Sequence, residues 1–240
     1  MRGRPGQSRY KTKRSTPIPF KEFVEIIENT EDLEEKSLLA FLFYTGARVS
    51  EIVGDSAKRY KKLSQKGRAL KEKGILPRDW IKRPEHEGLW IWVERPPIKG
   101  LTKEDFEIDK TKNVLNVNLK PVKRGRRIAP LELPLDLPYM DLILKQWRKT
   151  KKGEKIWRFS PWQVWDIVKR ASNGRLYPHA FRFSKATLFA RDPNIAVSDM
   201  QYWFGWARAS TADRYILPAR GSEKIIRALK REIQQNIPLE

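Results

Sequence analysis

The segment over residues 31–44 places the strongest constraint on the fold of this chain. Its run Leu38-Leu39-Ala40-Phe41-Leu42-Phe43 would be apolar on every side of a helix, and such a helix is stable only where other elements surround it. Thr45-Gly46 then breaks the helix. The apolar stretch is far too short to span a bilayer. We therefore predict a globular domain built around this one helix.

Apolar residues at helical spacing predict the elements that surround it. One apolar stripe begins after Pro19, and Thr30 is placed to cap the next helix. Ser160 and Pro161 are typical of a helix start, with a cap followed by proline at the first helical position. Further helices are expected over residues 47–53, 139–147, 162–171, 179–191, 197–205 and 222–235.

Strands are predicted from β-branched and aromatic runs and from apolar–polar alternation. They cover residues 89–93, 114–119 and 128–133, and a turn over 120–127 joins the last two into a hairpin. The predicted fold class is therefore α+β, a mainly helical domain with a small antiparallel sheet or hairpin.

Positive charge dominates the composition. The 50 Lys and Arg residues outnumber 29 Asp and Glu, for a formal net charge of +21, so the expected partner is a polyanion, most simply double-stranded DNA. The charge collects in a basic arm over residues 1–17, in residues 55–88 and in the turn over 120–127. The arm is too polar to pack and is expected to order only on phosphate. Residues 55–88 fit either a basic helix that projects from the core or a long exposed insertion.

The chain contains no Cys and two His. This excludes a disulfide framework and thiolate metal sites, and it leaves little for an imidazole cluster. We therefore expect no cofactor and no metal. The N-terminal residues MRGRPGQSRYKTKR lack the apolar core of a signal peptide, and we predict a cytoplasmic, DNA-associated protein that does not enter a membrane.

Three short blocks follow one another along the chain. The first is Thr45-Gly46-Ala47-Arg48-Val49-Ser50-Glu51, the second is His179-Ala180-Phe181-Arg182, and the third runs from Phe204-Gly205-Trp206 to Tyr215. Arg182 follows Arg48 by 134 positions, Trp206 follows Arg182 by 24, and Tyr215 follows Trp206 by nine. Blocks of this kind in this order resemble the tyrosine recombinase (phage-type integrase) family over residues 20–236.

The resemblance implies that Tyr215 attacks a DNA phosphate to form a 3′-phosphotyrosyl bond. Arg48 and Arg182 would then hold the phosphoryl oxygens, and His179 would relay the tyrosine proton. Metal-free cleavage of a phosphodiester needs a nucleophile, charge neutralisation and an acid for the leaving hydroxyl, and arginine donates bidentately to phosphate while staying charged. Glu51, three residues after Arg48 on the same helical face, is placed to hold that guanidinium.

Trp206 stands where most of the family carries His. An indole N–H can donate to a phosphate but cannot exchange a proton. We therefore expect Trp206 to complete the catalytic pocket by positioning and packing, and an ordinary core aromatic is the alternative.

The family carries its catalytic lysine on a β-hairpin between the first Arg and the His. The hairpin of this chain offers Lys120 and Lys123, and Lys120 precedes Pro130 by ten positions, close to the spacing in the family. Lys120 is therefore the predicted general acid, with Lys123 as the alternative. The other basic residues of the turn are expected to bind DNA phosphates together with Lys123, namely Arg124, Arg126 and Arg127.

The predicted organisation is a basic arm over residues 1–17, a catalytic domain over 18–220 with the insertion at 55–88, and a C-terminal helix over 221–240. That helix carries an apolar stripe and packs either on its own core or on a neighbouring protomer of a dimer to tetramer on DNA. Most of the family grips DNA with an N-terminal helical domain. Here 17 residues precede the first helix, so the arm and the insertion replace that grip, or the chain is part of a longer gene product.

The leading prediction is a site-specific recombinase or integrase of a mobile genetic element. A type IB topoisomerase would use the same nucleophile and the same arginines. A DNA-binding protein that keeps the fold but not the catalysis is the alternative from another class.

Overall fold

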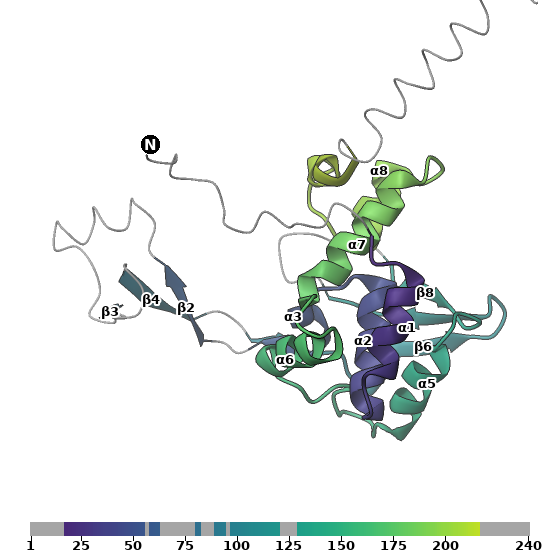
Figure 1. The fold of residues 1–240 in the computed structure, drawn as a ribbon, viewed down its shortest axis with the longest axis horizontal. Helices are drawn as coiled ribbons and strands as arrows, with labels where there is room; N and C mark the ends of the chain where they lie inside the picture. Colours follow the sequence, from purple (N-terminus) through teal and green to yellow (C-terminus); the bar gives the residue numbers. More distant parts are fainter. Residues whose placement is uncertain are drawn as a thin grey trace, which may run out of the picture.

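The structure, a computed structural model, describes residues 17–55, 58–62, 80–82, 89–94, 97–120 and 129–216. Figure 1 shows a body of helices with a small sheet packed beside it. The elements in chain order are α1 (Phe20–Glu28), α2 (Leu33–Thr45), α3 (Val49–Ile52), β1 (Gly54–Asp55), β2 (Lys58–Lys62), β3 (Trp80–Lys82), β4 (Leu89–Glu94), β5 (Ile98–Lys99), η1 (Lys103–Asp105), β6 (Phe106–Asp109), β7 (Val114–Val117), β8 (Leu131–Pro134), α5 (Met140–Lys149), α6 (Pro161–Ala171), α7 (Pro178–Arg191) and α8 (Val197–Phe204). Residues 210–216 form a further helical segment.

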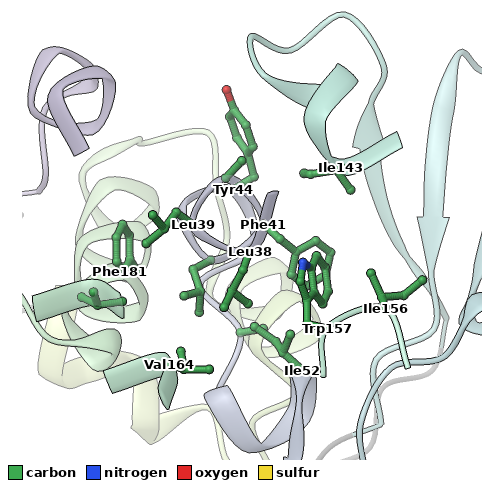
Figure 2. Packing of buried hydrophobic residues seen from close by; sticks show 14 of the residues in the cluster. Leu38, Leu39, Phe41, Tyr44, Ile52, Ile143, Ile156, Trp157, Val164 and Phe181 are labelled. Atoms are coloured by element: carbon green, nitrogen blue, oxygen red, sulfur yellow. The ribbon is translucent and has the colours of Figure 1, made fainter. Parts of the chain in front are cut away.

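Helix α2 lies at the centre of the body, as its composition predicts. Most of its residues are buried, and it packs against α1, α5 and α7. A buried polar pair joins two parts of this core, because the Trp157 indole N–H donates to the Ser37 hydroxyl at 2.8 Å. Figure 2 shows the apolar side chains that several elements contribute around α2: Ile52, Ile143, Ile156, Trp157, Val164 and Phe181.

The start of α2 differs from the prediction. Asp32, not Thr30, is the N-cap, and its carboxylate accepts the backbone N–H of Glu35 at 2.9 Å. The Thr30 hydroxyl instead donates to the Ile26 carbonyl at 2.9 Å, which closes the end of α1. A carboxylate is the better cap here because it also carries negative charge to the positive end of the helix.

The predicted hairpin is confirmed as strands β7 and β8, which join β6 in an antiparallel sheet of order β6-β7-β8. Leu115 pairs with Leu133 and Val117 with Leu131, and these four side chains are buried. The alternation along each strand therefore places one face on the core. Strand β6 was not predicted from the sequence.

Two further antiparallel sheets lie within residues 54–99. Strand β1 pairs with β5, and β4 lies between β2 and β3. The predicted strand over 89–93 is confirmed as β4. The basic-helix alternative is wrong for Lys58–Lys62, which forms β2 and pairs with β4 along its whole length. Lys58–Lys62 forms a strand because it pairs with β4, whose sequence is rich in β-forming residues. The sequence of Lys58–Lys62 alone does not indicate a strand.

The later helices follow the prediction. The Ser160 hydroxyl accepts the backbone N–H of Gln163 at 3.2 Å, and the Gln163 side chain accepts the Ser160 N–H at 2.8 Å, so α6 begins where expected. Helices α5, α7 and α8 correspond to the segments predicted over 139–147, 179–191 and 197–205. The arm up to residue 16, residues 121–128 of the turn and the predicted helix over 222–235 lie outside the described residues.

No helix in the described part of the chain is long and apolar enough to cross a membrane.

Gly46 ends α2 in a left-handed conformation with a φ of 57°. A Cβ there would lie 3.1 Å from Lys185 Cβ and 3.2 Å from Arg182 Cα, so the close approach of α7 to α2 requires glycine. Gly46→Ala is expected to lower the free energy of unfolding in urea by more than the ~1–2 kcal/mol that left-handed strain alone costs.

Gly153→Ala is the matched control for this measurement. Gly153 has a φ of 78°, but no atom lies within 4 Å of the position its Cβ would take. This variant therefore adds strain without crowding. Equal losses of stability in the two variants would contradict the proposed role of Gly46 in helix packing.

Candidate functional site

Arg48 lies at the N-terminus of the short helix α3. Its guanidinium Nη1 donates to Glu51 Oε1 at 2.7 Å, and its backbone N–H donates to Glu51 Oε2 at 2.9 Å. The Glu51 side chain is fully buried, whereas 22% of the Arg48 side chain is exposed. The predicted support of Arg48 by Glu51 is therefore present, and it holds the guanidinium at the surface of the body.

A cavity of about 370 Å³ opens beside Arg48. The N-terminal ends of α3, α6 and α7 meet around it, and backbone N–H groups at helix N-termini favour anions, as a guanidinium does. The lining, as far as the structure describes it, contains no Asp or Glu: Ala47, Arg48, Val49, Ser50, Pro161, Trp165, Tyr177, Pro178 and His179. Arg48 and His179 are therefore the side chains of this lining that could meet an anion.

Arg182 lies inside the protein rather than in the cavity wall, with 2% of its surface exposed. Its Nη1 donates to the Gly46 carbonyl and its Nη2 to the Phe204 carbonyl, each at 3.0 Å. The guanidinium also lies over the Phe204 ring, 4.8 Å from the ring centroid. A buried guanidinium must be hydrogen-bonded, and carbonyls at helix C-termini carry partial negative charge. Arg182 thus joins the ends of α2 and α8, a role that its sequence motif does not reveal.

Phe204, Trp206 and Tyr215 form a column of stacked rings. The centroids of Phe204 and Trp206 are 4.8 Å apart, and those of Trp206 and Tyr215 are 5.5 Å apart with planes at 4°. Phe183 contacts the Tyr215 ring at a centroid distance of 5.6 Å. Trp206 and Tyr215 are both buried. The column therefore packs against the Tyr215 ring and restricts its position.

Tyr177 lies in the cavity wall and interacts electrostatically with Tyr215 of this column. It is the N-cap residue of α7 and lines the cavity beside His179. Burial raises the pKa of Tyr177, and the nearby Tyr215 phenol raises it further, so the two phenols lie within electrostatic reach of each other. Tyr177 was not predicted as a site residue from the sequence. The signal that could have found it is its position directly before Pro178 and His179.

Lys120 lies after the end of β7 and is not among the residues that line the cavity. Its ammonium is 3.4 Å from Asp105 Oδ1, and 68% of its side chain is exposed. An exposed pair of this kind contributes little to stability. The basic residues predicted to bind DNA beyond it lie outside the described residues, namely Lys123, Arg124, Arg126 and Arg127.

The structure thus divides the six predicted catalytic residues into three groups. Arg48 and His179 meet at the cavity. Arg182 and the stacked column lie in the interior. Burial and the Tyr215 phenol of this column raise the pKa of Tyr177, which lines the cavity. Lys120 is separate, after the C-terminal end of the central strand β7 and beside Asp105.

Comparison with known proteins places the fold. No protein family matches the sequence, and no curated protein matches it. The crystal structure of XerA recombinase is similar, with a TM-score of 0.50 and 14% identity, over 98% of this chain and 68% of that chain. The fold is tyrosine-recombinase-like. This confirms the fold class expected from the three blocks, a mainly helical domain with small antiparallel sheets.

Lys185, one turn after Arg182 on α7, lies among aromatic rings. Its ammonium is 4.8 Å from the centroid of Phe43 and 5.8 Å from that of Tyr44. Burial lowers the pKa of Lys185 to about 8, because apolar surroundings disfavour the charged form. The ring faces attract the ammonium and act against this shift. Burial also raises the pKa of Tyr44 to about 12, so Tyr44 stays neutral while Lys185 titrates.

A pH series on Lys185→Met tests this environment. The pKa of an unfolded lysine is about 10.4, so above pH ~8 the native wild type has released a proton that its unfolded state still binds. The stability of wild type relative to Lys185→Met should therefore be constant below pH ~8 and rise with pH from there to about 10.4. Urea denaturation of both proteins across this range measures the difference. A difference that does not change with pH would mean that the ring contacts cancel the effect of burial.

Proposed function

We propose that the chain is a site-specific DNA recombinase that cuts and rejoins DNA through a 3′-phosphotyrosyl intermediate. One observation supports this above all. Arg48 and His179 share a cavity, and the Tyr215 phenol lies within electrostatic reach of Tyr177 in its wall. The proposed cation and the proposed proton carrier thus line one cavity, and the proposed nucleophile acts electrostatically on its wall, which supports the set that acid–base phosphoryl chemistry needs.

In the proposed reaction the Tyr215 oxygen attacks the scissile phosphorus while the bond from phosphorus to the 5′-oxygen breaks. The phenolic proton passes to His179, and Arg48 neutralises charge on the non-bridging oxygens. The departing 5′-oxygen takes a proton from a general acid. Attack by a second 5′-hydroxyl reverses these steps and frees Tyr215, so the reaction conserves the bond energy and needs no cofactor or metal.

Arg182 and Trp206 support this chemistry from behind the cavity. Arg182 binds the Gly46 and Phe204 carbonyls, and Trp206 aligns the Tyr215 ring by stacking. We propose that both also contact the phosphate when bound DNA brings it to Tyr215.

Lys120 is the proposed general acid, and Lys123 is the alternative. The contact of Lys120 with Asp105 is exposed, so replacing it by a contact with DNA costs little. Lys123 and the arginines of the same turn are proposed to hold the phosphates beside it: Arg124, Arg126 and Arg127.

The remaining basic segments complete the proposal. The arm over residues 1–17 and the insertion over 55–88 grip the duplex around the catalytic domain over 18–220. The C-terminal helix over 221–240 packs in cis or on a neighbouring protomer of a dimer to tetramer on DNA. The proposed substrate is double-stranded DNA in the cytoplasm.

A non-catalytic DNA-binding protein on the same fold is the second candidate. It is favoured by the position of Lys120 outside the cavity and by Trp206 at the position where the family usually carries His. A type IB topoisomerase would form the same covalent bond but relax supercoils without sequence choice.

Nicked suicide DNA tests the nucleophile. Cleavage next to the nick releases a small 5′-hydroxyl fragment, and because this fragment diffuses away, the strand cannot be rejoined and the covalent intermediate accumulates. Wild type should give a covalent protein–DNA adduct on a denaturing gel, and Tyr215→Phe should give none, since it lacks the attacking oxygen. Tyr202→Phe is the matched control and should keep the adduct. Tyr202 is an exposed α8 residue, and its hydroxyl donates to the Pro130 carbonyl at 2.9 Å.

Two results would count against the proposal. An adduct formed by Tyr215→Phe would mean that another group is the nucleophile. If wild type forms none on any substrate, including DNA that flanks its own gene, the non-catalytic candidate is favoured.

DNA with a 5′-thiol leaving group identifies the general acid, because a thiolate departs without protonation. Lys120→Ala is expected to slow cleavage of ordinary DNA by about 100-fold or more and to regain the wild-type rate on the thiol substrate. Lys123→Ala should lose less activity and gain nothing from the thiol. The opposite pattern in cleavage rates would assign the acid to Lys123.

A further inference from the structure

Two tryptophans of α6 form an exposed stack that the proposed reaction does not use. The rings of Trp162 and Trp165 lie with centroids 5.5 Å apart and planes at 13°. Trp162 is 69% exposed and Trp165 40%. Large aromatic rings that face solvent together mark a binding surface, because their burial by a ligand would be favourable.

The stack is held in place before any ligand arrives. The Lys169 ammonium lies 5.4 Å from the centroid of Trp165, on the same helical stripe as both rings. The same ammonium donates to the Gly174 carbonyl at 2.9 Å. Trp165 therefore contacts Trp162 and Lys169, which restricts its rotation. A preorganised ring loses little side-chain entropy when a ligand binds.

The charges around the stack indicate what kind of ligand it takes. Trp165 is itself part of the lining of the cavity that contains Arg48 and His179, and the described lining has no acidic side chain. The neighbouring acid Asp166 faces a cation, because Glu35 and, to a smaller extent, Asp166 raise the pKa of Arg170. An apolar peptide would cover the rings but offer no acceptor to the exposed part of the Arg48 guanidinium, beyond its contact with Glu51. A nucleotide supplies both a flat π face and a phosphate, so it satisfies the rings and the cavity together.

We propose that Trp162 and Trp165 form a stacking platform for an unpaired DNA base next to the phosphate held at Arg48 and His179. This inference rests on the proposed function only in that DNA occupies the cavity. Bases inside a duplex already stack on both neighbours, so an exposed ring face is of use only to a base that has left the stack. The proposed substrate is therefore DNA with an unpaired nucleotide beside the cleavage point.

Two duplexes that share one strand with a single 2-aminopurine test the platform. In one the 2-aminopurine is paired with thymine, and in the other it lies opposite an abasic site and is unpaired. Fluorescence anisotropy at one fixed salt concentration gives both dissociation constants for the full chain. Wild type should prefer the duplex with the unpaired base by about fivefold to 150-fold, the range for one stacked base. The fluorescence of the 2-aminopurine should also fall on binding, because stacking on an indole quenches it.

Trp162→Ala should lose both the preference and the quenching, while its binding to the fully paired duplex stays near that of wild type. Trp162→Phe should keep part of the preference, since it retains a ring. Leu188→Ala is the matched control, because it removes another exposed apolar side chain, on α7, and should keep the full preference.

Three results would overturn the inference. In the first, wild type binds both duplexes equally, and in the second, Trp162→Ala weakens binding of both to the same degree. In the third, Trp162→Ala changes the oligomeric state in sedimentation without changing the preference, which would make the stack a protein interface. Binding needs no strand cleavage, so a base preference without a covalent adduct would support the platform and contradict the recombinase proposal. An adduct without a base preference would contradict the platform alone.

Discussion

The buried guanidinium of Arg182 organises the candidate site. It binds the Gly46 carbonyl at the end of α2 and the Phe204 carbonyl at the end of α8. Arg48 follows Gly46 by two residues, and Trp206 follows Phe204 by two, so one side chain sets the positions of both segments. Burying a charge is costly unless its N–H groups are bonded. The same bonds that stabilise Arg182 therefore fix the geometry around it.

This arrangement separates the rigid parts of the candidate site from the parts proposed to meet DNA. The stacked rings of Phe204, Trp206 and Tyr215 are buried, and Trp206 packs on one face of Tyr215, the proposed nucleophile. Arg48 is tied to the buried carboxylate of Glu51 yet keeps part of its surface exposed. A phosphate that enters the cavity meets a cation whose orientation is already fixed, which is how preorganised electrostatics lower a reaction barrier.

Short-range features of the sequence predicted much of this. The apolar run of α2 identified the core helix, the alternation in Val114–Val117 identified its strand, and the spacing of Arg48 and Glu51 predicted their ion pair. Long-range features were not predicted. The burial of Arg182 depends on how the ends of two distant helices meet, and β2 forms a strand because β4 pairs with it. The sequence does not indicate that Tyr177 and Trp165 line one cavity, because the N-termini of three helices from separate parts of the chain form it.

The identity of the residue that becomes linked to DNA tests the central claim most directly. Tyr177 lines the cavity and Tyr215 is the proposed nucleophile. Trypsin separates the two, because cleavage after Arg175 and Arg182 isolates Tyr177 whereas cleavage after Arg214 isolates Tyr215. Mass spectrometry of the nuclease-trimmed adduct should find the nucleotide on the peptide that begins with Tyr215. A nucleotide on the peptide with Tyr177, or on any other residue, would contradict the assignment of the nucleophile and of the site around it.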